Sequence, residues 1–403
     1  MISTSRTYSI ALLLSLFTVL LPSTGITAEP SMPSEKTMDG VFKPRARDLG
    51  IQPGVLSPGP LNAITDVAGV RVGHLTLKEG TDINTGVTAI LPHGGNLYQD
   101  KVPAGFAVAN GFGKFAGSTQ IMELGEIETP VVLTNTLSVA EGMKGVIEYT
   151  LQQPGNENVG SVNAVVGETN DGFLNDIRRR VVSEEHVLKA ISSATGGAVP
   201  EGPVGAGTGT INFGWKGGIG TSSRRLPVHM GAYTVGVLVQ TNYGGILQMD
   251  GLPVGRELDQ YYLHDELDKG DADGSVILVV ATDAPLSDRN LTRLANRALM
   301  AIARTGSPVT NGSGDYAIAF STAESVRRTS LRRNSVSTLD DLPNNMLSPL
   351  FEASLEAAEE AIYNSLVAGV TTHGYKGTIM ALPLDKLTGI IERFRPASSP
   401  GSK

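Results

Sequence analysis

Residues 265–285 read DELDKGDADGSVILVVATDAP, an acidic, glycine-containing stretch that runs directly into an apolar one. The change falls at Gly274 and Ser275. The second half predicts a buried strand, because Val, Ile and Leu fill it almost without polar interruption. If the backbone were cut between these two residues, Ser275 would carry a hydroxyl nucleophile and a free amine on one residue. An adjacent amine is one of the groups that can activate a weak hydroxyl.

Strands and helices are predicted on both sides of this strand. Further strands are predicted at 64–75 (a strand pair with a glycine turn), 131–134, 233–240, 315–320 and 380–383. Helices are predicted after 136–138, after Ser183, over 287–305 and from Ser348 to Gly369. Because these elements mix without a strict βαβ rhythm, we expect layered α/β architecture. It would be an αββα sandwich, with two stacked sheets between layers of helices.

Composition and the first residues restrict the class of protein. The net charge of −8 argues against non-specific nucleic-acid binding, and the absence of Cys excludes thiol nucleophiles and thiolate metal sites. Residues 1–28 predict a cleaved signal peptide, with Arg6 before an apolar run from Ile10 to Leu21. That run is shorter than the ~20 residues that span a bilayer. We therefore expect a periplasmic or secreted protein without a membrane anchor, beginning with a Pro- and Gly-rich arm over 29–60.

Several common sites lack their sequence signals. No two of the six His have zinc-ligand spacing, no G-x-S-x-G elbow occurs, and no phosphate-binding loop is present. In GAGTGT (205–210), Thr210 stands where a dinucleotide loop needs its third glycine. The sequence 271–274 has only part of a calcium-loop pattern. We therefore predict neither a metal nor a cofactor.

Four segments place small polar residues next to apolar strands. They are GETNDG (167–172), TNYGG (241–245), DGSVILVVATDAP (273–285) and NGSGDYAIAF (311–320). Clusters at strand ends are a common place for catalytic groups, because the strands hold them rigidly. The same residue types also form ordinary turns, so composition alone leaves both interpretations open.

A resemblance favours the catalytic interpretation. Together with NTGVTAILPHGGN (84–96), LTNTLSVAEGM (133–143) and GAGTGTINFGWKGGIGTSSR (205–224), the four segments resemble the DmpA/BapA family. This family comprises self-processing L-aminopeptidase/D-esterase-amidases and β-aminopeptidases. The similarity extends from about Ala46 to Pro396. It implies an αββα fold, a small peptide, amide or ester substrate, and a tetramer of αβ units.

The resemblance also implies roles for particular residues. The chain would cut itself between Gly274 and Ser275, giving an α subunit (29–274) and a β subunit (275–403) of a single catalytic domain. Ser275 would be the nucleophile. Ser313 and Asp315 would hold and tune its amine, and Asn242 would donate to the oxyanion. Glu168 would hold the free amine of the substrate, although Asn170 stands where part of the family has Tyr.

The chemistry of these residues agrees with such roles. A free amine has a pKa of about 7.7–8.0, so it can accept the Ser275 proton and pass it to the leaving amine. Ser313 and Asp315 lie two apart on a predicted strand, so their side chains should share one face, towards Ser275. Two other functions stay open: a self-processing acyltransferase of similar fold, and a non-catalytic periplasmic peptide-binding protein. Whether the substrate begins with a β-, D- or L-amino acid is also left open.

Overall fold

The computed structural model describes residues 43–264 and 274–395, and all elements below lie within them. A five-stranded sheet has the order β1-β2-β6-β7-β4. Its strands are β1 (Arg71–Glu79), β2 (Ile83–Leu91), β6 (Val131–Asn135), β7 (Val165–Thr169) and β4 (Phe115–Ala116). Helices α2 (Val139–Leu151) and α3 (Glu184–Ser192) cover its outer face. Val87, Val132 and Val187 belong to the apolar cluster that joins these helices to the sheet.

A seven-stranded sheet holds the Gly274–Ser275 junction. Its order is β10-β11-β12-β13-β3-β14, with β5 against β3. The strands are β10 (Ile219–Arg225), β11 (Thr234–Asn242), β12 (Ser275–Thr282), β13 (Gly314–Ser321), β3 (Asp100–Gly111), β14 (Arg328–Thr329) and β5 (Glu126–Ile127). Helices α5 (Asp288–Arg304) and α7 (Ser348–Val367) pack on its outer face through a second apolar cluster.

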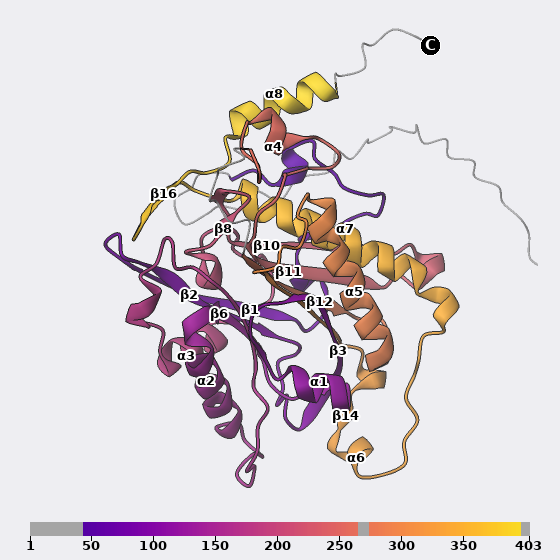
Figure 1. The fold of residues 1–403 in the computed structure, drawn as a ribbon. Helices are drawn as coiled ribbons and strands as arrows, with labels where there is room; N and C mark the ends of the chain where they lie inside the picture. The colour runs from indigo at the N-terminus through magenta and orange to yellow at the C-terminus, as the bar shows by residue number, and fades with distance from the viewer. Residues whose placement is uncertain (1–42, 265–273, 396–403) are drawn as a thin grey trace, which may run out of the picture. The chain divides into compact units, whose positions relative to one another are not determined.

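The two sheets face each other across a third cluster. Ile90, Leu133 and Val165 enter it from the five-stranded sheet, and Ile277 and Ile318 from the seven-stranded sheet. Figure 1 shows the resulting order of layers, with α2 and α3 on one side and α5 and α7 on the other. The predicted αββα sandwich is confirmed. Strand β12 is buried along its whole length because it contributes alternate side chains to the inner and outer clusters.

Helix α5 shows why the capping pattern predicted its position. Ser287 has an extended backbone just before the first turn, and Asp288 lies in that turn, where a negative charge is favourable. The apolar positions are three and four residues apart, and those expected to face inward are all buried: Leu291, Leu294, Ala295, Ala298, Leu299 and Ile302. The chain turns away at Gly306, whose φ of 104° is in the left-handed region.

Two sequence predictions of strands are wrong. Residues 64–75 do not form a strand pair: Ile64–Asp66 is a short 3-10 helix (η2), and β1 begins at Arg71 and pairs instead with β2. Residues 380–383 are not a strand either. Met380 accepts one backbone hydrogen bond, from Lys216, and Pro383 is the residue before helix α8 (Leu384–Phe394).

Shorter elements complete the described part. Two hairpins are β8 (Ile211–Asn212) with β9 (Trp215–Lys216), and β15 (Thr372–Gly374) with β16 (Gly377–Ile379). The remaining α-helices are α1 (Ser118–Leu124), α4 (Val254–Glu257) and α6 (Ser330–Arg333). The predicted arm falls partly outside the described residues, and Ala46–Leu49 within it form a 3-10 helix (η1). The predicted signal peptide lies wholly outside them.

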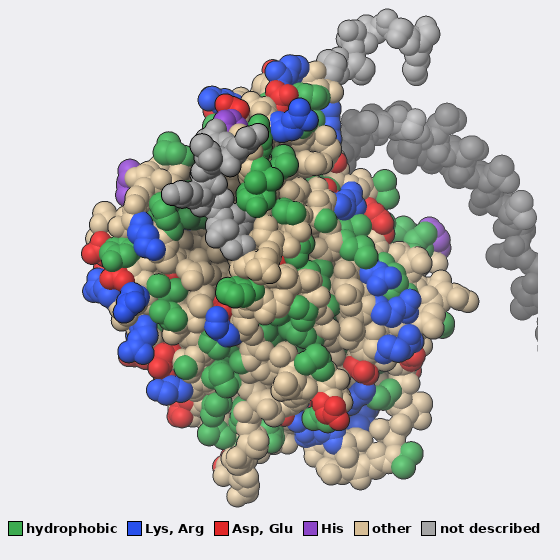
Figure 2. Space-filling view, viewed as in Figure 1, with side chains coloured by type: hydrophobic (Ala, Val, Ile, Leu, Met, Phe, Trp, Pro, Cys, Tyr) green, Lys and Arg blue, Asp and Glu red, His purple; other side chains and the backbone are tan. Residues whose placement is uncertain are grey.

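The described surface mixes charges of both signs. In Figure 2, Lys and Arg side chains lie in several separate groups on the face drawn, with Asp and Glu side chains among them. Among the residues placed by the structure, no helix is both long and apolar enough to cross a bilayer, and no three or more His, Asp or Glu side chains are grouped as metal ligands would be.

Candidate active site

Three predicted site segments meet where the neighbouring strands β11, β12 and β13 of the seven-stranded sheet begin or end. Ser275 opens β12 and pairs with Asn242 at the end of β11 and with Gly314 at the start of β13. Because β11 is antiparallel and β13 parallel to β12, the end of one and the start of the other lie beside Ser275. Residues far apart in the sequence are thus brought together by strand pairing.

The Ser275 hydroxyl contacts the bond at which the cut is predicted. Its Oγ donates a hydrogen bond to the carbonyl oxygen of Gly274 at 2.5 Å. The backbone N–H of Gly314 donates to the same carbonyl oxygen at 3.2 Å and to the Ser275 Oγ at 3.3 Å. Two donors therefore polarise the Gly274 carbonyl, and the hydroxyl is already next to it. This arrangement suits attack by Ser275 on its own preceding carbonyl.

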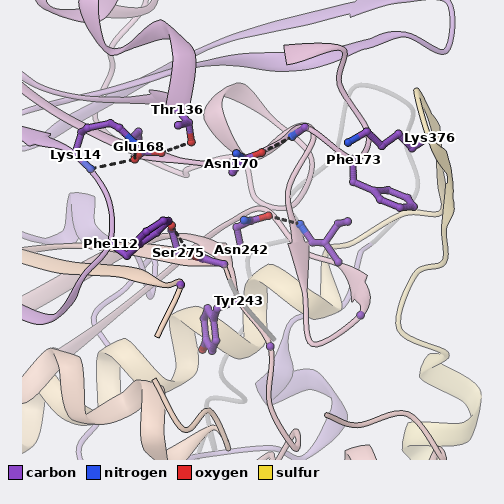
Figure 3. A pocket seen from close by; sticks show the side chains of 16 residues that line it. Phe112, Lys114, Thr136, Glu168, Asn170, Phe173, Asn242, Tyr243, Ser275 and Lys376 are labelled. Carbon is purple, nitrogen blue, oxygen red and sulfur yellow. Dashed lines mark hydrogen bonds and ion pairs between the residues drawn. The ribbon is translucent and has the colours of Figure 1, made fainter. Parts of the chain in front are cut away.

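The Asn242 side chain is held by a hydrogen bond at the end of its amide that faces away from Ser275. Its Oδ1 accepts a hydrogen bond from the backbone N–H of Ile211 at 3.0 Å. Because that end must be the oxygen, the amide NH₂ is left to donate elsewhere. In Figure 3 the dashed line from the Asn242 oxygen runs away from Ser275, which lies on the other side of the amide. Asn242 is only 8% exposed, so little of it contacts bulk water.

A pocket of about 470 Å³ opens over these groups and is lined by both sheets. Ser275, Gly274 and Asn242 line it from the seven-stranded sheet, and Glu168 at the end of β7 lines it from the five-stranded sheet. The other lining residues are Phe112, Lys114, Thr136, Asn170, Gly172, Phe173, Ile211, Gly214, Tyr243, Gly244, Gly312 and Lys376. Figure 3 shows most of their side chains around the pocket.

Glu168 is the buried carboxylate of this pocket, with its side chain 2% exposed. One oxygen accepts from the backbone N–H of Lys114 at 3.0 Å and faces the Lys114 ammonium at 3.5 Å. The other accepts from the Thr136 hydroxyl. Asn170, two residues further on, accepts from the N–H of Gly172 and lines the same pocket. The site thus offers a fixed negative charge near Ser275, suited to a cationic amine.

Ser313 and Asp315 share a face, as predicted, but they do not line the pocket. The Ser313 hydroxyl donates to Asp315 Oδ1 at 2.6 Å, and burial raises the pKa of Asp315 to about 6. Asp315 lies on the same face of its strand as Ala317, which belongs to the outer cluster. Ser275 lies on the same face as Ile277, which belongs to the inner cluster. In the uncut chain the pair therefore approaches β12 from the face opposite the Ser275 hydroxyl, through the backbone of Val276.

Sequence reasoning missed some of the groups at the site. The N–H of Gly314 carries no side-chain signal, and only strand pairing places it at the Gly274 carbonyl. Lys114 and Thr136, which hold Glu168, lie in segments far from it in the sequence. Thr136 did have a signal, because it follows β6 within LTNTLSVAEGM, a segment quoted for its resemblance. Lys114 had none beyond being a cation between two Phe residues.

Comparison with known proteins decides the family. The model of peptidase family S58 matches residues 62–380. The chain belongs to peptidase family S58. It is 42% identical to the β-peptidyl aminopeptidase BapA of Sphingosinicella microcystinivorans, over 87% of this chain and 93% of that protein.

Two solved structures of high similarity support the S58 assignment. The β-aminopeptidase of a Burkholderia species is 39% identical with a TM-score of 0.79, covering 88% of this chain and 99% of that one. The L-aminopeptidase D-Ala-esterase/amidase of Ochrobactrum anthropi is 36% identical with a TM-score of 0.80, covering 87% and 99%. That structure is described as a variant of the Ntn-hydrolase fold. The predicted enzyme class, an N-terminal-serine aminopeptidase, is confirmed by the family and these relatives.

Proposed function

We propose that this protein is an exported aminopeptidase that cuts its own Gly274–Ser275 bond and then releases N-terminal β-amino acids from short peptides and amides. The observation that carries the proposal is the contact between the Ser275 hydroxyl and the Gly274 carbonyl, at 2.5 Å, inside a pocket that also holds Asn242 and Glu168. Membership of peptidase family S58 supports the hydrolytic chemistry.

Self-cleavage needs only a small movement of the Ser275 side chain. The hydroxyl turns from the carbonyl oxygen of Gly274 to its carbon, and the carbonyl oxygen gains negative charge that the N–H of Gly314 can stabilise. The C–N bond breaks, the nitrogen of Ser275 takes the hydroxyl proton, and an ester joins Gly274 to the Ser275 oxygen. Water hydrolyses the ester, which leaves a Gly274 carboxylate and a free Ser275 amine.

Turnover repeats this chemistry on a substrate. The Ser275 amine accepts the hydroxyl proton as the oxygen attacks the substrate carbonyl, and it later delivers that proton to the leaving amine. The amide of Asn242 donates a hydrogen bond to the oxyanion. A donor of this kind stabilises the transition state by about 3 kcal/mol. Ser313 and Asp315 approach β12 at the backbone of Val276, the residue next to Ser275, and tune the freed amine from there. Water then hydrolyses the acyl-serine.

Glu168 supports an aminopeptidase in particular. Its buried carboxylate can pair with the free amine of a substrate, in place of the Lys114 ammonium at 3.5 Å. The choice of β-amino acids is supported by two relatives, the β-peptidyl aminopeptidase of Sphingosinicella microcystinivorans and the β-aminopeptidase of a Burkholderia species. In such substrates one more carbon separates the amine from the carbonyl that Ser275 attacks.

The first test is the intact mass of the purified protein. We expect two chains, one of them beginning Ser-Val-Ile-Leu at Ser275, and the other beginning at residue 29 when the protein is made with its export signal. Ser275→Ala should give one uncut chain without peptidase activity. Ser335→Ala, at an exposed serine far along the chain, is the matched control and should be cut and active. An active wild-type protein with a continuous chain would contradict the mechanism.

The second test concerns the substrate and the assembly. The cut enzyme is given p-nitroanilides of β-alanine, D-alanine and L-alanine, and we expect the highest kcat/KM for the β-alanyl compound. Faster release of D- or L-alanine would overturn the proposed substrate class but not the cut. Transfer of the acyl group to an added amine in place of water would favour an acyltransferase. Light scattering on the same sample tests whether the enzyme is the tetramer of αβ units that the family resemblance implies.

A further inference from the structure

Lys216 is a buried cation that the proposed mechanism does not use. It ends β9, and its side chain is among the largest that are fully buried. Its Nζ donates to three backbone carbonyl oxygens, those of Gly217 at 2.7 Å, Thr210 at 2.8 Å and Gly207 at 3.0 Å. These contacts tie the glycine-rich loop before β8, at Gly207 and Thr210, to Gly217 just after β9.

One of these carbonyls belongs to the peptide group that fixes Asn242. The C=O of Thr210 accepts from Lys216, and the N–H of the same peptide, that of Ile211, donates to Asn242 Oδ1 at 3.0 Å. An unbroken series of hydrogen bonds therefore runs from the Lys216 ammonium through this peptide to the Asn242 amide. Each bond in such a series polarises the next, and the effect is larger where water is excluded.

The geometry indicates that Lys216 acts in its charged form. An ammonium has three protons, and three carbonyl oxygens at 2.7–3.0 Å accept one each. Burial and, after it, the positive charge of Lys78 lower the pKa of Lys216, whereas the nearby Asp171 carboxylate raises it. The three carbonyl dipoles also stabilise the charged form, because each accepts a hydrogen bond from it. A neutral amine would direct its lone pair at one of these oxygens, which the short distances disfavour.

We propose that Lys216 is a positioning residue for the oxyanion-binding amide of Asn242. By fixing and polarising the Thr210–Ile211 peptide, it holds the Asn242 oxygen in place and makes the NH₂ group a stronger donor where charge develops. The proposal deepens the proposed function, on which it rests. It predicts an effect on kcat rather than on substrate binding, because the oxyanion forms only after the substrate is bound.

The test is a double-mutant cycle on cut enzyme, with kcat calculated per cut chain. Asn242→Ala should lower kcat about a hundredfold. Lys216→Met, which keeps the length and removes the charge, should lower kcat about tenfold with KM changed less than twofold. The double variant should be no more than about threefold slower than Asn242→Ala alone, because both changes interrupt one series of hydrogen bonds.

Two further variants separate catalysis from folding. Lys216→Gln keeps amide N–H donors without the charge, and it should fold better than Lys216→Met and have an intermediate kcat. Lys101→Met is the matched control: Lys101 is also buried, pairs with Glu128, and lies at the end of β3 opposite the site. It should lose thermal stability and keep its kcat.

The outcomes distinguish the two proposals. If Asn242→Ala slows turnover but Lys216→Met does not, or if the two effects multiply in the double variant, the role of Lys216 is overturned and the proposed function stands. If neither Lys216 variant gives folded, cut protein, the lysine is a structural residue and the role is likewise overturned. If Asn242→Ala leaves kcat unchanged, the oxyanion role of Asn242 fails and the role of Lys216 fails with it.

Discussion

The carboxyl group of Asp315 shows how burial sets the chemistry of a single residue at the site. Burial raises its pKa to about 6, and hydrogen bonds from the Ser313 hydroxyl and the Val276 backbone offset only part of that rise. The folded protein therefore favours the protonated acid more than the unfolded chain does. Asp315 contributes stability that is complete below about pH 4 and is lost as the pH rises through about 6.

Asp315→Asn should remove this dependence. In a Ser275→Ala background, which keeps one chain, the free energy of unfolding of the parent should fall relative to Asp315→Asn between pH 4 and pH 7. The difference should be on the order of 3 kcal/mol, which corresponds to the pKa change of about two units. Urea unfolding at several pH values measures it. Burial also raises the pKa of Asp171 to about 6. Both proteins contain Asp171, so its contribution to the pH dependence cancels in the difference between them. Parallel pH profiles would contradict the prediction.

At the scale of elements, local signals predicted helices better than they predicted the site. Helix α5 follows from its cap and its apolar spacing, and both are properties of neighbouring residues. Helix α8 also has such spacing, at Leu387, Ile390 and Ile391, but the only element predicted from the sequence in this region is a strand, over 380–383. The pairing of Asn242 with Ser275 depends on long-range strand order, which no local pattern encodes. The resemblance supplied those residues. Only the structure places the N–H of Gly314 at Ser275 and connects Lys216 to Asn242 through the Thr210–Ile211 peptide.

The contact between β10 and α7 gives a test at this scale. A Cβ on Gly220 would lie 1.9 Å from the backbone oxygen of Ala361 and 2.8 Å from the nitrogen of Ser365, so the helix and strand would have to separate. Gly220→Ala should therefore lower the free energy of unfolding by about 3 kcal/mol. Gly389→Ala is the control, because nothing lies near its Cβ in exposed helix α8, and it should be neutral or stabilising by up to ~1 kcal/mol. Equal midpoints in urea would refute the packing argument.

At the scale of the whole molecule, the proposed cut divides one sheet between two chains. In the order β10-β11-β12-β13-β3-β14, strands β10, β11 and β3 precede Ser275 in the sequence and the others follow it. Arg224, before the cut, pairs with Glu356 at 2.8 Å and Glu360 at 2.7 Å, after it, with all three side chains fully buried. Because buried pairs are screened little by salt, the two chains should stay together after the cut.

The concentration dependence of the refolding rate tests whether the sheet is divided between two chains. The cut enzyme and uncut Ser275→Ala are unfolded in urea and diluted at several protein concentrations. We expect Ser275→Ala to regain its circular dichroism at a rate independent of concentration. The cut enzyme should refold more slowly at lower concentration, because two chains must first meet. If both proteins refold at the same rate at all concentrations, either the halves stay associated in urea or the chain is not cut.

The alternation of strands from both halves in one sheet also imposes an order of events on the life of the enzyme. The Gly274–Ser275 bond meets the Ser275 hydroxyl only after the sheet has assembled, so assembly must come before the proposed cut. The proposed cut would then remove the tether that made assembly a reaction of one molecule. An enzyme made in this way works with a structure that its separated pieces have no efficient route to rebuild, and damage to it calls for new synthesis rather than repair.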